Sequence, residues 1–142
     1  MVLIDANLLI YAYDESSPYQ RQARVWLETQ FNDEPVVGLP WVSVLAFLRI
    51  VTHPKLPSPS SFTAASNTVD DWLAQDNVKL IVPGPRHWSI LRTLSIDAQA
   101  RGGFVTDAHL AALAIENGAA LCTNDAGFRR FKGLRLLNPL AG

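Results

Sequence analysis

The stretch MVLIDANLLIYAY, residues 1–13, sets a single carboxylate into an otherwise apolar run. Residues 2–4 are consecutive β-favouring apolar residues, a pattern that predicts a short buried strand. Residues 6–13 carry apolar side chains at helical spacing and predict a helix directly after it. Asp5 stands where the two predicted elements meet. Since burying an unpaired carboxylate is costly, Asp5 is expected to cap the helix, to have a partner or to bind a cation.

The same order of strand and helix recurs along the chain. Short apolar runs predict further strands at residues 78–83, 119–123 and 134–139. Helices are predicted at residues 16–31, 38–54, 61–76, 86–103 and 104–118. Short strands that alternate with helices are typical of an α/β fold, here a three-layer α/β/α sandwich with a central parallel sheet. The connections are too short for a second unit, so residues 1–142 are expected to form a single domain.

Composition limits the classes of protein to which the chain can belong. About half of its 142 residues are apolar, which indicates a packed globular protein. Twelve basic and thirteen acidic residues give a formal net charge of −1, which excludes a globally basic nucleic-acid coat but allows a local basic patch. Cys122 is the single cysteine, so no internal disulfide is possible. Without a basic leader or a membrane-length apolar run, a soluble cytoplasmic protein is expected.

Three aspartates are expected at one edge of the predicted sheet. Asp5 ends the first predicted strand, and Asp125 follows the strand at residues 119–123. Asp107 is placed in the first turn of the helix at 104–118, with Thr106 as its N-cap, on the helix face that is expected to be buried. Functional groups of open parallel sheets gather outside the carboxyl ends of the strands.

Any one of these acids alone is more often a helix cap than a ligand. Three carboxylates at one edge repel one another unless a cation neutralises them. Carboxylate oxygens are hard ligands that suit Mg²⁺ and also Mn²⁺. The sequence therefore favours a metal site formed by Asp5, Asp107 and Asp125.

Other chemistries lack their motifs. One cysteine and three scattered histidines give no zinc-ligand spacing, and His109 is interpreted as a helix-surface residue. No Gly-x-Ser-x-Gly elbow, phosphate loop or dinucleotide fingerprint occurs.

Four stretches resemble a known family. VLIDANLLIYAY (2–13), the run VTDAHLAALAIENGAALCTNDAGFRRF (105–131) and LRLLNP (134–139) are similar to PIN-domain ribonucleases, in particular the VapC-like toxins of type II toxin–antitoxin systems. LPWVSVLAFLRIVTHP (39–54) is similar to a subgroup of those toxins.

The resemblance implies a magnesium-dependent endoribonuclease that leaves a 5′-phosphate and a 3′-hydroxyl. Asp5, Asp107 and Asp125 match the acidic positions of the family. Thr123 and Asn124 match polar residues that orient the last acid.

The sequence departs from the family pattern at one position. Many members carry a glutamate in the third helix where this chain has Phe47. Either Arg49 and its surroundings reshape the site, or three acids hold the metal alone.

A basic segment follows the last acid. Arg129, Arg130 and Lys132 are interleaved with phenylalanines, and Arg49 belongs to a smaller patch; all four are candidate RNA contacts. A solvated basic turn with two core aromatics is the alternative interpretation. Structured RNA such as transfer or ribosomal RNA is a plausible substrate, because specific readout usually targets unpaired loops.

The resemblance also predicts a VapB-like antitoxin that wraps the toxin and inserts a basic side chain among the acids. The four tryptophans are candidate anchors for that partner or for a homodimer, with core packing as the default for each. Two rival functions stay open. One is a haloacid-dehalogenase-type phosphatase with Asp5 as nucleophile, although a second Asp two residues on is missing. The other is a non-catalytic RNA- or protein-binding module on a degenerate nuclease fold.

Overall fold

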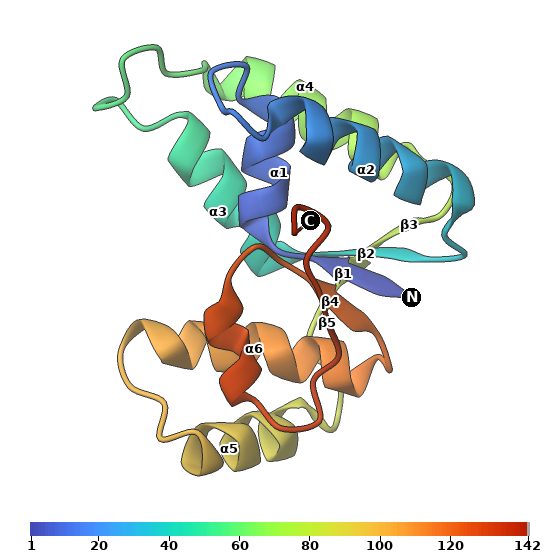
Figure 1. Ribbon diagram of the computed structural model, residues 1–142, viewed down its shortest axis with the longest axis vertical. Coiled ribbons are helices and arrows are strands. Elements are labelled where there is room, and N and C mark those ends of the chain that lie inside the picture. Colours follow the sequence, from blue (N-terminus) through green and yellow to red (C-terminus); the bar gives the residue numbers. More distant parts are fainter. Residues whose placement is uncertain (142) are drawn as a thin grey trace.

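A computed structural model describes residues 1–141 and is built on one parallel sheet (Figure 1). Its five strands are β1 (Val2–Ile4), β2 (Val37–Pro40), β3 (Val78–Ile81), β4 (Ala120–Cys122) and β5 (Leu136–Leu137), in the order β3-β2-β1-β4-β5. The α-helices are α1 (Ala6–Tyr13), α2 (Gln20–Asp33), α3 (Trp41–Val51), α4 (Phe62–Leu73), α5 (His87–Asp97) and α6 (Gly103–Glu116), and η1 (Ala126–Arg130) is a 3₁₀ helix.

Helices cover both faces of the sheet. The first four helices lie on one face, and α5 and α6 lie on the other (Figure 1). Alternate strand residues divide between two cores: Val2 and Ile4 pack with the first layer, and Leu3 packs with the second. This arrangement confirms the predicted α/β class and the three-layer sandwich with a central parallel sheet. Within residues 1–141, no helix is long and apolar enough to cross a bilayer.

The sheet contains one strand more than the sequence predicts. The predicted helix 38–54 is wrong at its start, because β2 occupies Val37–Pro40 and pairs with both β1 and β3. All four residues of β2 are buried. A short apolar run in a buried strand cannot be distinguished by its sequence pattern from one in a buried helix. Gly38 marks the difference: a Cβ there would lie 2.8 Å from Ile81 Cγ1 and 2.9 Å from Leu3 Cδ1. The strand therefore packs where a side chain does not fit.

The boundary between α5 and α6 also differs from the prediction. Thr106 is not an N-cap, because α6 begins at Gly103 with Gly102 as its N-cap at φ +54°. The predicted helix 86–103 ends early, since α5 stops at Asp97 and Gln99 takes φ +53°. The two glycines thus start a helix instead of ending one. As a result Asp107 lies beyond the first turn of α6.

Candidate active site

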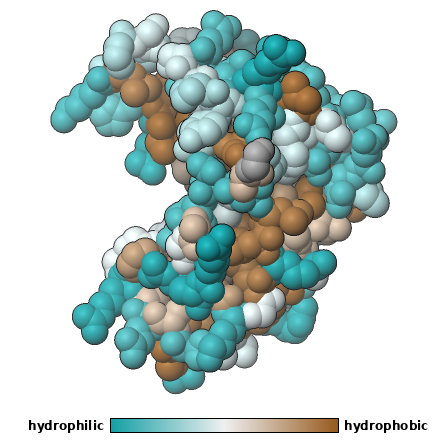
Figure 2. All heavy atoms as spheres, viewed as in Figure 1, coloured by the Kyte–Doolittle hydropathy of each residue, from teal (hydrophilic) through white to brown (hydrophobic). Residues whose placement is uncertain are grey.

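Asp5 and Thr123 are neighbours because β1 and β4 are adjacent parallel strands. Their register pairs Ile4 with Cys122, so the next residue of each strand emerges at the same edge. The Asp5 backbone N–H donates to the Cys122 carbonyl at 2.9 Å. The Thr123 hydroxyl donates to Asp5 Oδ2 at 2.7 Å. On the side toward which β1 runs from the N-terminus, Figure 2 shows a hollow between the two helical layers.

Asp5 combines the role of a cap with that of a buried acid. Its Oδ1 accepts the Ala6 N–H at 2.7 Å, so the carboxylate caps α1. A helix cap is one of the three roles that the sequence allows for Asp5. Its Oδ2 accepts from Thr123 and, at 3.4 Å, from Asn7 Nδ2. One carboxylate oxygen therefore accepts a hydrogen bond from the start of α1, and the other accepts hydrogen bonds from the side chains of Thr123 and Asn7.

Thr123 is the centre of that network. It is 3% exposed, and its hydroxyl also accepts from Asn7 Nδ2 at 3.1 Å and from the Asp125 N–H at 3.0 Å. One buried hydroxyl thus links the side chain of Asp5 to the backbone of Asp125. Asn124 lies beside it: its N–H donates to Asn7 Oδ1 at 3.3 Å.

Two asparagines of the network escaped the sequence reasoning. Asn7 bonds to residues that directly follow β1 and β4, and Asn138 Nδ2 donates to Asn124 Oδ1 at 3.1 Å. The only sequence signal for Asn7 is its position two residues after Asp5. Asn138 has no local signal, because it reaches the site only through the pairing of β5 with β4.

The three aspartates act on one another electrostatically. Burial raises the pKa of Asp5, and the charges of Asp107 and Asp125 raise it further, against the hydrogen bonds from Thr123 and Ala6. Burial also raises the pKa of Asp107, followed by the charge of Asp125, whereas Arg130 opposes the rise. Asp125 is exposed, and its Oδ1 accepts the Gly127 N–H at 2.8 Å, which caps η1. The positive charge that opposes these carboxylates at Asp107 is that of Arg130.

The donor set fits a hard divalent cation. Carboxylates whose charges raise the pKa of Asp5 and of Asp107 gain from a cation, and their oxygens are the ligands that Mg²⁺ and Mn²⁺ prefer. Among residues 1–141, however, no three His, Cys, Asp or Glu side chains stand together as a ready ligand cluster. The charges of the acids act on one another, but the side chains do not form a complete set of metal ligands.

Phe47, where the resemblance leads one to expect a glutamate, is part of the core. Its ring is fully buried and packs edge-on against Tyr13 and Trp72, with centroid distances of 5.2 and 4.8 Å. Arg49 is exposed in the last turn of α3. Phe47 itself thus brings no oxygen to the site.

The basic segment divides into cations with different surroundings. Arg129 and Arg130 are exposed on η1, and Lys132 pairs with Asp97 of α5 at 3.5 Å. Of the four predicted RNA contacts, Arg130 is the one whose charge acts on Asp107. The two interleaved phenylalanines are core residues, as the alternative interpretation expected: Phe128 and Phe131 are buried.

Two further titratable groups lie outside the predicted set of site residues. His109, predicted at the helix surface, is half-buried, and its Nδ1 is 2.9 Å from Nε2 of His87. Burial and the charge of His87 lower the pKa of His109. Burial raises the pKa of Cys122 to about 12, so the thiol is not a nucleophile at neutral pH.

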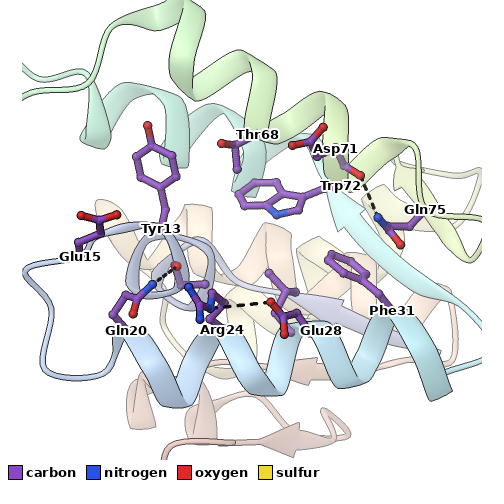
Figure 3. A pocket seen from close by; sticks show the side chains of 12 residues that line it. Tyr13, Glu15, Gln20, Arg24, Glu28, Phe31, Thr68, Asp71, Trp72 and Gln75 are labelled. Carbon is purple, nitrogen blue, oxygen red and sulfur yellow. Dashed lines mark hydrogen bonds and ion pairs between the residues drawn. The ribbon is translucent and has the colours of Figure 1, made fainter.

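A separate groove of about 440 Å³ lies between α1, α2 and α4 (Figure 3). Leu27, Phe31 and Trp72 give it an apolar floor. Its rim carries acidic side chains from Glu15, Glu28 and Asp71, together with Arg24, whose Nε lies 3.8 Å from Glu28 Oε1. None of the three site aspartates lines it. Trp72 is therefore a core and groove residue, whereas Trp41 and Trp88 are exposed.

Comparison with known proteins yields concordant matches. The family model described as PIN domain matches residues 2–134. Ribonuclease VapC37 of Mycobacterium tuberculosis is 38% identical over 142 residues, covering 99% of both chains. Ribonuclease VapC43 of the same species is 38% identical over 143 residues, covering 100% of this chain and 97% of that protein.

Solved structures show the same fold at low identity. VapBC2 from Rickettsia felis, bound to a promoter DNA fragment, superposes with a TM-score of 0.75 at 18% identity, covering 97% of this chain and 98% of that one. VapC20 of Mycobacterium tuberculosis, described as a sarcin–ricin loop cleaving toxin, superposes with a TM-score of 0.66 at 15% identity, covering 95% and 99%.

Proposed function

The chain belongs to the PIN domain family, among the VapC ribonucleases, and from this membership we propose a magnesium-dependent endoribonuclease that acts in the cytoplasm as the toxin of a toxin–antitoxin pair. Its substrate is structured RNA, such as transfer or ribosomal RNA. The observation that supports this most is at the carboxyl edge of the sheet, where burial and the charges of Asp107 and Asp125 raise the pKa of Asp5. Such an edge suits a cation and a phosphodiester.

In the proposed site, Asp5, Asp107 and Asp125 would hold Mg²⁺, or Mn²⁺ in its place. When bound, the metal supplies positive charge that lowers the pKa of a water and offsets charge developing on the phosphodiester. Thr123 and Asn124 keep Asp5 and Asp125 in position through the network described above.

The remaining steps need only side chains at the same edge. Asp125, which is exposed, or Asp5 accepts the proton of the attacking water. Hydrolysis breaks the bond between phosphorus and the 3′ oxygen, so one fragment keeps a 5′-phosphate and the other gains a 3′-hydroxyl.

In this proposal, RNA is attracted by exposed cations of η1 and α3. Arg129 and Arg130 of η1 and Arg49 of α3 are the proposed phosphate contacts, because phosphate contacts supply most sequence-independent affinity. Lys132 joins them by exchanging its exposed ion pair with Asp97 for RNA.

Removal of metal is expected to abolish cleavage. Purified protein is incubated with a set of structured RNAs in Mg²⁺ or in EDTA, and the products are resolved on denaturing gels. Cleavage is expected with Mg²⁺, none in EDTA, and recovery when excess Mg²⁺ or Mn²⁺ is added back. The Asp107→Asn protein is expected to be inactive in every condition.

Two outcomes point elsewhere. Cleavage that persists in EDTA contradicts the metal-dependent mechanism. RNA binding without cleavage favours the non-catalytic module, for which the buried Phe47 is the supporting observation. Family membership leaves the phosphatase alternative without support.

The proposed antitoxin docks in the groove of Figure 3. An apolar floor with acidic side chains at its rim is complementary to an amphipathic helix that carries basic residues. The same partner reaches the acids with a basic side chain and so competes with metal and RNA. A homodimer through exposed aromatic side chains, including Trp41 and Trp88, is also proposed.

A charge placed in the groove is expected to weaken antitoxin binding. Phe31→Glu puts a carboxylate on the apolar floor and should raise the dissociation constant at least about tenfold by calorimetry. Ile96→Glu, on exposed α5 in the opposite layer, is the matched control and should bind normally. Equal affinity of the two variants contradicts the groove as the docking site.

A further inference from the structure

Phe104 is an aromatic residue on the helix that carries Asp107. It lies in the first turn of α6, three residues before Asp107, and it is 43% exposed. The guanidinium carbon of Arg130 stands 3.5 Å from the centre of its ring. Arg130 in turn ends η1, the helix that Asp125 caps. The stacked pair therefore joins the two elements that carry Asp107 and Asp125.

Arg130 is held in one orientation without being neutralised. Its Nε donates to the Gly127 carbonyl at 2.9 Å, and the N–H of Gly127 donates to Asp125. Of the three ion pairs found within residues 1–141, none includes Arg130. Its charge nevertheless lowers the pKa of Asp107 against the effect of burial. The side chain is exposed, so a fixed cation at the acid edge keeps donors for a ligand.

A ring stacked with a guanidinium suits one nucleotide of RNA. Guanidinium groups bind phosphate through paired N–H donors. Unpaired bases stack on aromatic rings and on arginine planes, whereas bases inside a duplex are already stacked on their neighbours. A contact needed only for packing would not require an exposed ring beside an unpaired cation at the site.

We propose that Phe104 and Arg130 form a platform that holds one unpaired nucleotide of the RNA next to the acid site, its phosphate on the guanidinium and its base on the stacked pair. This inference rests on the proposed function and names the substrate class of the same site. It makes loops and single strands, not continuous duplex, the RNA that the protein engages.

The test measures RNA binding separately from cleavage. A hairpin RNA with a fluorescent 2-aminopurine in its loop is titrated with protein in EDTA, at one fixed salt concentration because phosphate contacts are salt-dependent. The blunt duplex of the same stem is titrated in parallel. Phe104→Leu keeps an apolar side chain but removes the ring, and Phe104→Trp keeps a ring. Phe62→Leu, at an exposed ring on α4 in the opposite layer, is the matched control.

Phe104→Leu is expected to weaken hairpin binding at least about fivefold and to reduce the quenching of 2-aminopurine. Phe104→Trp and Phe62→Leu should bind like the parent protein, and duplex binding should not change in any variant. Equal hairpin affinity and quenching in Phe104→Leu and the parent overturn the platform, while metal-dependent cleavage by the parent still supports the ribonuclease. Absence of both RNA binding and cleavage in the parent overturns the proposed function and the platform with it.

Discussion

Asp5→Asn is expected to lower the rate of RNA cleavage by about 1,000-fold and to leave the protein folded. Asparagine retains an oxygen that can accept the Ala6 N–H and cap α1, but it removes the negative charge of the most buried acid. Because Phe47 supplies no fourth carboxylate, the site depends on Asp5 more than a four-acid site would. The measurement is the single-turnover cleavage rate in saturating Mg²⁺.

The control for Asp5→Asn separates chemistry from folding. Folding raises the pKa of Asp5, so in metal-free protein its ionised form costs stability once the pH exceeds the usual carboxyl range. The asparagine variant should therefore melt no lower than the parent at neutral pH in EDTA. Asp33→Asn, at an exposed position at the end of α2, should cleave normally. Parent-like cleavage by Asp5→Asn would mean that this acid is only a helix cap.

Thr123→Val is expected to reduce kcat by about 10- to 100-fold. Valine has the shape of threonine but neither donates to Asp5 nor accepts from Asn7 and the Asp125 N–H. KM for RNA should change little, because the proposed RNA contacts lie on other residues. Steady-state cleavage of one hairpin substrate over a range of RNA concentrations separates the two constants.

Thr123→Ser is the matched variant, since it restores the hydroxyl and loses only a methyl group. It should recover most of the lost kcat. If serine and valine variants are equally impaired, the effect comes from packing at a buried position and not from the hydroxyl.

Local patterns were sufficient for the class of fold. The apolar run before Asp5 and the helical spacing after it predict a strand and a helix, and both are present as β1 and α1. β2 could not be found in the same way, because its burial on all sides removes the periodicity that separates strand from helix. The start of α6 was missed for another reason: Gly102 caps it with backbone geometry and no side-chain signal.

The positions of candidate site residues that directly follow strands could be predicted from the sequence. The contacts that depend on the register between strands could not. Asp5 and Asp125 stand just after strands, so their shared edge could be inferred from the sequence. The contacts of Asn138 depend on how β5 pairs with β4, which no local pattern encodes. Lys132 looked equivalent to Arg130 in the sequence, but the fold turns one toward Asp97 and the other toward Phe104.

The hydrogen bond between Thr123 and Asp5 joins residues 118 positions apart. β1 and β4 come from opposite ends of the chain, and Asn138 joins them from β5 near the C-terminus. During translation the first acid leaves the ribosome long before its partners are made. A nascent chain thus carries an incomplete set of acids until the segment around Asp125 has been synthesised.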